Sequence, residues 1–323
     1  MTHSRKKKQR ENDFPQTLQE AVKYFGNLDN SQRFMIAVRW PDGKVRCPSC
    51  GSEKVSYLEN ARLWKCYTKH PRQKFSLKVG TIFEDSPLGL DKWMMAIWLI
   101  ANCKNGISSC ELARGLDITQ KSAWHMLQRI RLAMRVGSFE KLGGEIEVDE
   151  TYIGGKARFM HKKKREAMIK GRGSVGKVAV MGLLARHGEV RTKVIREADQ
   201  ETLHGEVKRH VEKGAELFTD GWKGYNGLDA EYVHEVINHA EEYVRGNVHT
   251  NSIENFWSLL KRGLKGTYVS VEPFHLFRYL DEQSFCFNHR KLTDGERFSI
   301  VAQHVIGRPL TYAELTGQVE CQP

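Results

Sequence analysis

Two aspartates carried by predicted β-strands constrain the fold of this chain more than any other feature. The segment EIEVDETYIGG places Asp149 inside a strand, and AELFTDGWKGY places Asp220 at the end of another strand, before a turn. Burying an ionised acid is costly, so an acid in a strand normally faces solvent, is paired or binds a metal. The elements around these two acids therefore decide what the chain can be.

Those elements follow a definite order. After the strand with Asp149 come a basic insert, two strands joined by a His-Gly turn (KVAVMGLLAR and EVRTKVIR), a helix over 199–213, the strand with Asp220, a strand near YVHEVI and an amphipathic helix. This is the element order of a ribonuclease H-like domain, a mixed α/β sheet with flanking helices. In that fold the first and fourth strands lie side by side, so Asp149 and Asp220 are predicted to be neighbours.

The amphipathic helix begins in HTNSIENFWSLLKRG (249–263). Its apolar stripe consists of residues at helical spacing, namely Ile253, Phe256, Trp257, Leu260 and Leu264. Glu254 and Lys261 lie two turns apart and share one edge of that stripe. A glutamate beside an apolar stripe is usually solvated, but beside two strand aspartates Glu254 becomes the predicted third carboxylate.

Other polar residues near these acids have simpler roles open to them. Asn251 is an alternative for the third position. Its leading expected role, however, is to cap the N-terminus of the helix, a role that Ser252 could also take. Glu147 is predicted on the same side of its strand as Asp149, and Glu150 on the other side. Either glutamate would support the site or face solvent.

Cysteine spacing near the N-terminus indicates a metal site. Cys47 and Cys50 form a C-x2-C pair, and Cys66 follows after 15 residues. This fits three ligands of a structural zinc ribbon, which needs four in a tetrahedron. The standard fourth position is Lys69, so His70 is the predicted substitute. The alternative is that Cys66 is a buried thiol and no metal binds.

The segment SSCELARGLDITQKSAWHMLQRIR (108–131) has helix-turn-helix spacing, with the second helix capped at Thr119. Its polar face is expected to contact DNA through Gln120, Lys121, His125, Gln128 and Arg129. A helical bundle that packs in the same way is the alternative. The basic insert (158–177) would add phosphate contacts, among them Lys162, Lys163, Lys164 and Arg165.

Charge and hydropathy restrict the class of protein. The chain has 51 basic and 39 acidic residues, a net charge of +12, which favours nucleic acid or an acidic membrane surface as partner. The longest apolar run, WMMAIWLIA, has nine residues, against roughly 20 needed to span a bilayer. The odd number of cysteines, seven, does not resemble a secreted disulfide framework. The expected location is therefore cytoplasmic, on DNA.

With these motifs in view, the chain resembles bacterial insertion-sequence transposases of the DDE superfamily, in the ISXO-like branch with an N-terminal zinc ribbon. The resemblance covers nearly all of residues 45–320, and its most specific pieces are GTIFEDSPLGLDKW, VDETYIGGK and VHTNSIENFWSLLKRGLKGTYVSV. Relatives more often close the ribbon with a second C-x2-C pair, where this chain has His70.

The resemblance implies a catalytic triad of Asp149, Asp220 and Glu254, with Lys261 as the basic residue seven positions on and Arg262 beside DNA phosphates. Such a triad would hold two Mg²⁺ (or Mn²⁺) ions about 3.5–4 Å apart, with Asp149 bridging them, for in-line phosphoryl transfer. Water would cut at the element end, and the 3′-hydroxyl released would attack target DNA. The expected partners are the terminal inverted repeats, target DNA and a second copy of the chain or more.

Two other functions fit the same motifs: a DNA-binding regulator with an inactive ribonuclease H-like domain, and a structure-specific DNA nuclease. The expected divisions of the chain are an N-terminal tail with short helices (1–43), a zinc ribbon (44–86), a helix-turn-helix region (87–136), a catalytic domain (143–293) and a C-terminal helical tail (294–323).

Overall fold

The computed structural model describes residues 14–135, 140–155, 161–163, 166, 176–237 and 249–318. The chain divides into two compact units, one formed by the chain up to Leu99 with Leu292–Pro309, and the other by Ile100–Lys291 with the C-terminal segment from Leu310.

The first unit combines short helices with a small antiparallel sheet. Its helices are α1 (Leu18–Phe25), α2 (Leu28–Arg39), the 3₁₀ turn η1 (Glu59–Ala61), the start of α3 (Leu90–Asn102) and α10 (Asp294–Gln303). Its strands, in the order β1-β2-β3, are β1 (Val55–Leu58), β2 (Leu63–Cys66) and β3 (Lys74–Phe75). Capping boxes start α1 at Thr17 and α10 at Thr293, each with a glutamate three residues later.

Aromatic packing holds this unit together. Phe25, Phe34 and Phe298 surround Phe14 with ring centroids 4.9–6.4 Å apart, which joins α1, α2 and α10. The apolar run over 93–101 forms most of α3, and nearly all of its side chains are buried. A helix that is apolar on all sides belongs in a core, which explains that run.

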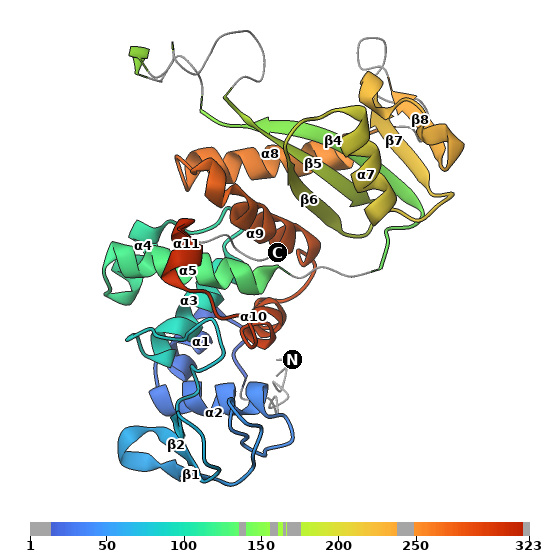
Figure 1. The fold of residues 1–323 in the computed structure, drawn as a ribbon. Helices are drawn as coiled ribbons and strands as arrows, with labels where there is room; N and C mark the ends of the chain where they lie inside the picture. Colours follow the sequence, from blue (N-terminus) through green and yellow to red (C-terminus); the bar gives the residue numbers. More distant parts are fainter. Residues whose placement is uncertain are drawn as a thin grey trace, which may run out of the picture. The chain divides into compact units, whose positions relative to one another are not determined.

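The second unit is built on a five-stranded mixed sheet with the order β6-β5-β4-β7-β8 (Figure 1). Its strands are β4 (Glu145–Ile153), β5 (Val178–Ala185), β6 (Val190–Ile195), β7 (Glu216–Asp220) and β8 (Val233–Ile237). β4 is antiparallel to β5 and parallel to β7. The prediction that the first and fourth strands of this domain are neighbours is thus confirmed.

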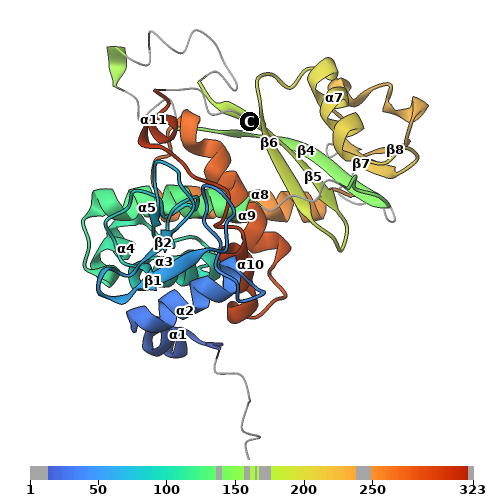
Figure 2. The same cartoon turned by 60° about the horizontal axis from the view of Figure 1, so that its bottom comes forward.

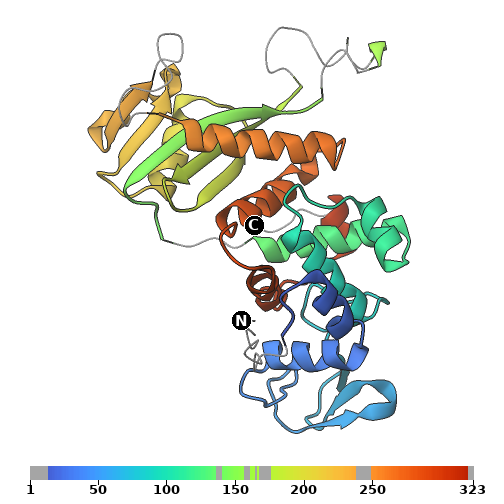
Figure 3. The same cartoon turned by 180° about the vertical axis from the view of Figure 1, so that it is seen from behind.

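Helices cover both faces of this sheet (Figures 1 and 3). On one face lie α7 (Gln200–His210) and the 3₁₀ turns η3 (Lys223–Tyr225) and η4 (Leu228–Ala230), over a core that includes Ile146 and Val148 of β4. On the other lie α8 (Asn251–Gly266), the turn η5 (Pro273–His275) and α9 (Leu276–Asn288). Side chains alternate along a strand, so β4 presents Asp149 to α8 and Glu150 to the α7 face.

Helix α4 (Ser109–Leu116) packs against α5 (Gln120–Met134), which packs against α9, and α11 (Tyr312–Thr316) follows near the C-terminus (Figure 2). Thr119 caps α5 as predicted, accepting a hydrogen bond from the Ser122 backbone N–H. A buried ion pair joins α5 to α9, with Arg131 Nε 2.7 Å from Glu282 Oε2. Among the helices that the structure describes, none has the length and apolar character needed to cross a bilayer.

Candidate active site

Asp149 and Asp220 lie on adjacent parallel strands. Glu147 of β4 is opposite Phe218 of β7, and two residues further along each strand come Asp149 and Asp220. Both aspartates are half-buried. The predicted pair of carboxylates is therefore brought to one edge of the sheet by the register of these two strands.

The protein environment opposes ionisation of Asp149. Burial, followed by the negative charges of Glu150 and Asp220, raises the pKa of Asp149 to about 7, against hydrogen bonds that favour the charged form. Those bonds come from the Trp257 indole N–H, 2.9 Å from Oδ2, and from the Glu150 backbone N–H, 2.8 Å from Oδ1. A buried carboxylate beside like charges is a position where a cation would be favoured.

Glu150 connects the strands from the opposite face. Its Oε2 accepts a hydrogen bond of 2.5 Å from the hydroxyl of Tyr225, a buried residue of η3. Burial is the largest cause that raises the pKa of Glu150, and the charge of Asp220 adds to it while the Tyr225 bond opposes it. This contact ties β4 to the turn that follows Asp220.

Helix α8 reaches the site through Trp257 and Lys261. Gly182 of β5 pairs with Asp149, and a Cβ atom at Gly182 would lie 2.6 Å from Cζ2 of Trp257. The missing side chain lets the indole lie against the sheet and donate to Asp149. One turn later, burial lowers the pKa of Lys261, and attraction from Asp149 partly offsets this.

Glu254 lies one turn before Trp257 and is exposed, and its Oε1 accepts a 3.1 Å hydrogen bond from the Thr250 hydroxyl. Asn251 and Arg262 are also exposed on this helix. Across the described residues, a single group of three or more His, Cys, Asp or Glu side chains has its ligand atoms close enough to share a metal, and it is the cysteine cluster described below. The structure thus brings Asp149 and Asp220 together, and leaves the Glu254 carboxylate turned to Thr250.

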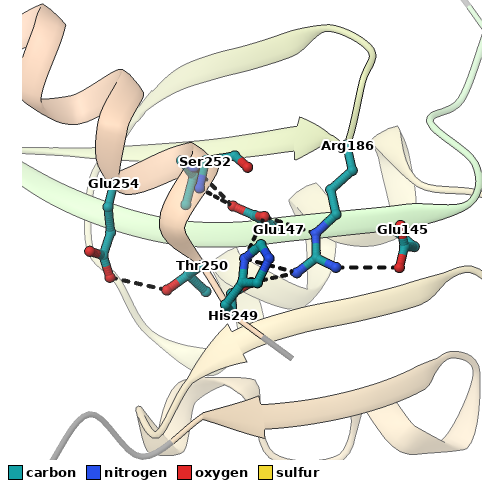
Figure 4. Close-up of polar contacts among 8 residues, drawn as sticks. Glu145, Glu147, Arg186, His249, Thr250, Ser252 and Glu254 are labelled. Carbon is teal, nitrogen blue, oxygen red and sulfur yellow. Dashed lines mark hydrogen bonds and ion pairs between the residues drawn. The ribbon is translucent and has the colours of Figure 1, made fainter. Parts of the chain in front are cut away.

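A buried network fixes the start of α8 (Figure 4). Glu147 is fully buried, and its Oε2 accepts hydrogen bonds of 2.9 Å from the backbone N–H groups of Ser252 and Ile253. Its Oε1 accepts a 2.9 Å bond from Arg186 Nε. A carboxylate that accepts hydrogen bonds from the first N–H groups of a helix gives these groups a partner, and its negative charge complements the helix dipole.

Arg186 extends this network to both flanks. It contacts Glu145 at 3.3 Å, donates 2.8 Å to the His249 backbone oxygen and stacks its guanidinium 4.1 Å from the centre of the Phe218 ring. His249 Nδ1 lies 3.3 Å from Glu147 Oε1. Four segments distant in the sequence therefore meet at the N-terminus of α8.

This network corrects one expectation and adds residues that the sequence did not reveal. The capping role predicted for Asn251 or Ser252 is wrong, because Thr250 is the N-cap, makes no side-chain cap bond, and Glu147 takes the helix N–H groups instead. Arg186 gives no signal in the sequence. Trp257 did give one, since it shares the helix edge of Glu254 and Lys261.

The four predicted zinc ligands cluster in the first unit. Ligand atoms of Cys47, Cys50, Cys66 and His70 all lie within 4.8 Å of one another. His70 Nε2 is 3.4 Å from Cys47 Sγ, and Cys50 Sγ is 3.7 Å from Cys66 Sγ. Three thiols and one imidazole are a donor set for tetrahedral Zn²⁺, so these residues fit a structural zinc ion.

The predicted DNA face of α5 is shorter in the structure than the sequence suggested. Gln120 and Lys121 are exposed, and His125 is half-buried, with its pKa lowered to about 4 by burial and by the charge of Arg129. Gln128 and Arg129 are buried: Gln128 contacts the Tyr279 hydroxyl, and Arg129 donates to the Leu310 backbone oxygen. The prediction that these two residues face DNA is wrong, because the second half of α5 is packed against α9.

Only part of the basic insert can be placed. Lys162 and Lys163 are exposed, whereas Lys164 and Arg165 lie outside the described residues.

Comparison with known proteins agrees with this geometry. Residues 141–288 match the ISXO2-like transposase domain, and residues 29–68 match the transposase zinc-ribbon domain, which includes Cys47, Cys50 and Cys66. A protein of the transposable element ISH50 from Halobacterium salinarum is 28% identical over 254 residues, covering 75% of this chain and 85% of that protein. The sheet that carries Asp149 and Asp220 therefore lies in a segment that matches an ISXO2-like transposase domain, and Cys47, Cys50 and Cys66 lie in a segment that matches a transposase zinc ribbon.

Proposed function

We propose that this transposase binds the ends of its insertion sequence and catalyses DNA strand cleavage and strand transfer through Asp149, Asp220 and Glu254. The observation that carries the proposal is that Asp149 and Asp220 lie at equivalent positions of the adjacent parallel strands β4 and β7, where burial and like charge raise the pKa of Asp149 to about 7. We assign the sheet to the ribonuclease H-like class, because its order β6-β5-β4-β7-β8 places the first and fourth strands together.

Asp149 and Asp220, joined by Glu254, would hold Mg²⁺. Hard carboxylate oxygens suit this ion, which is commonly bound through one or two carboxylates together with substrate phosphates. When bound, Mg²⁺ would supply Lewis-acid activation of the attacking oxygen and charge stabilisation of the leaving oxygen. Asp149 binds a cation only when ionised, so cation affinity is expected to rise with pH up to about 7.

Side chains around the pair position it. The indole N–H of Trp257 donates to Asp149 Oδ2 and the Glu150 backbone N–H donates to Oδ1, so that both oxygens of this carboxylate are oriented. Lys261 is close enough to Asp149 for the two charges to attract each other. Its ammonium group would lie near the phosphate that is cut and act on it as a point charge. Glu147 and Arg186 hold the start of α8, so that Trp257 and Lys261 stay against the sheet.

We assign DNA recognition to the helix-turn-helix formed by α4 and α5, with Gln120 and Lys121 at the exposed start of α5. Lys162, Lys163 and Arg262 would contact phosphates, giving affinity that depends on salt and little on sequence. Pairing of two element ends requires at least two active sites, so a homodimer or larger assembly is proposed on DNA. Zinc bound by Cys47, Cys50, Cys66 and His70 would hold the ribbon in shape.

The test is incubation of the full chain with DNA that carries the element ends, in the presence of Mg²⁺. Metal-dependent cleavage at the ends, followed by joining of the 3′-hydroxyl to target DNA and abolished by Asp149→Asn, is expected. Binding without cleavage would instead indicate a regulator, and cleavage of branched DNA without joining would indicate a nuclease.

The third carboxylate is tested by matched amide variants. Glu254→Gln should abolish joining, whereas Glu150→Gln should weaken it, because Glu150 is engaged by Tyr225 on the opposite face of β4. Asn251→Ala should leave joining near the wild-type rate if Glu254 is the ligand. The reverse pattern would assign the third position to Asn251.

A further inference from the structure

Trp222 stands apart from the other tryptophans. The chain has seven, all within the described residues, and five of them are at most 5% exposed: Trp40, Trp64, Trp93, Trp98 and Trp257. Trp124 is half-buried, and only Trp222 is exposed, at 50%. An exposed tryptophan two residues after Asp220 is a feature that the proposed metal chemistry does not use.

Two hydrogen bonds anchor Trp222, one through its backbone and one through its ring. The Trp222 backbone N–H donates to Asp220 Oδ1 at 3.1 Å, and its indole N–H donates to the Ala198 backbone oxygen at 3.3 Å. A Cβ atom at Gly224 would lie 2.6 Å from the indole nitrogen, so the glycine leaves room for the ring. An aromatic surface that is already fixed loses little conformational entropy when a ligand binds to it.

One exposed cation is next to Trp222 in the chain. Lys223, the following residue, is exposed, and the whole chain carries a net charge of +12. Single-stranded nucleic acid is commonly bound by an aromatic ring that stacks on a base beside cations that contact the backbone. Trp222 and Lys223 offer these two parts next to the carboxylate pair.

From this arrangement we infer that Trp222 is a stacking platform for the base of an unpaired nucleotide beside the phosphate that is cut. The inference rests on the proposed function, because that function brings a DNA end to Asp220. The nucleotide must be unpaired or extruded, since bases within a duplex stack on each other and offer no free face. Stacking does not read the base edge, so the site is expected to accept any of the four bases.

The experiment measures binding of the full chain to a fluorescent duplex of the element end that carries a short single-stranded 3′ overhang. A second duplex has abasic residues in the overhang, which removes the bases and keeps the phosphates. Wild-type protein should bind the abasic duplex about 5- to 150-fold more weakly, the usual range for loss of one base–aromatic stack. Trp222→Ala should bind the normal duplex more weakly than the wild type by the same factor, and it should bind the abasic duplex no more weakly than the normal one. Trp222→Phe should keep most of the difference in affinity between the two duplexes.

Matched variants separate stacking from other roles. Tyr312→Ala removes another exposed aromatic side chain, on α11, and should keep the full base dependence. The slope of affinity against salt should be unchanged in Trp222→Ala, because no phosphate contact is lost. Equal affinity of the wild type for the two duplexes would overturn the inference. Full base dependence in Trp222→Ala would also overturn it, and this result is expected if Trp222 instead contacts a protein partner.

The same samples distinguish this inference from the proposed function. Asp149→Asn should lose cleavage and joining but keep base-dependent binding. Base-dependent binding through Trp222 in a wild-type protein that cleaves no DNA supports the stacking site and contradicts the proposed function. Normal cleavage and joining with no base dependence supports the proposed function and contradicts the stacking site.

Discussion

At the scale of single residues, the charge of Asp149 links the candidate site to stability. Its pKa is raised from 3.8 to about 7, first by burial, so the folded chain holds this proton more tightly than the unfolded chain between about pH 4 and pH 7. The folded state therefore loses stability as the pH rises through this window, and the full cost is present above pH 7. A carboxylate retained at such a cost is expected where function requires it.

Asp149→Asn should abolish this pH dependence. Above pH 7 the variant is expected to be more stable than the wild type by roughly 1–3 kcal/mol. This is less than the free energy equivalent to the whole pKa shift, because Asp149 is partly exposed and the variant loses one hydrogen bond. Urea unfolding without added metal at pH 5 and pH 8 measures this. An equal change in stability between pH 5 and pH 8 in the wild type and in Asp149→Asn would contradict the assigned environment of Asp149.

The sequence predicted some of these residues and missed others for a physical reason. Asp149 and Asp220 follow from element order, because adjacent parallel strands bring equivalent positions together. Buried partners do not follow from local pattern: Glu147 meets the helix start 105 residues later, and Gln128 meets Tyr279 151 residues later. Periodicity shows which face of α5 is polar, but not that α9 covers its second half.

At the scale of elements, the docking of α8 against β4 and β5 decides the geometry of the site. Two features hold α8 against the sheet. One is the hydrogen-bond network of Glu147 and Arg186 at the start of the helix, and the other is the space over Gly182, which Trp257 occupies. The amphipathic stripe predicted the helix and its buried face. The features that fix its position come from the sheet, so the helix sequence alone could not reveal them.

Glu147→Ala should lower the free energy of unfolding by about 3–5 kcal/mol, because it leaves Arg186 buried without its main partner and removes the acceptor for two helix N–H groups. Glu145→Ala is the matched control. Glu145 is partly exposed and 3.3 Å from Arg186, so its loss should cost at most about 1 kcal/mol. Equal losses in urea unfolding would show that Glu147 does not hold α8.

Gly182→Ala should destabilise the protein by about 1–3 kcal/mol and slow strand joining, since the added methyl group forces Trp257 away from Asp149. Gly205→Ala is the control on the exposed side of α7, where no atom lies within 4 Å of the added Cβ. That change should be neutral or stabilise by up to about 1 kcal/mol, because alanine favours a helix. Thermal unfolding of the two variants tests the difference, and equal effects would argue against the close approach of α8.

At the scale of the whole molecule, the two units offer different sets of metal ligands. The first has three thiols and an imidazole that fit zinc, and the second has the carboxylates that we propose hold a hard cation. The cysteine spacing predicted three ligands of the zinc site. The fourth could be inferred only as a substitute for Lys69, because the spacing in the second knuckle is irregular and the chain must fold back to bring His70 near Cys47.

The full chain should retain one zinc ion after purification, and His70→Ala should lose most of it. Lys69→Ala changes an exposed residue at the standard fourth position and should retain zinc like the wild type. Elemental analysis of the three purified proteins gives the stoichiometry. Zinc retained by His70→Ala and lost by Lys69→Ala would contradict the assignment of His70.

The most direct test of the central claim, that Asp149 binds the metal used in strand transfer, is a change of metal preference. Asp149→Cys replaces a hard oxygen ligand with sulfur, which Mn²⁺ tolerates better than Mg²⁺. Strand joining by this variant should be absent with Mg²⁺ and partly restored with Mn²⁺, while Asp149→Asn stays inactive with both ions. Joining by Asp149→Asn at the wild-type rate with Mg²⁺ would contradict the account.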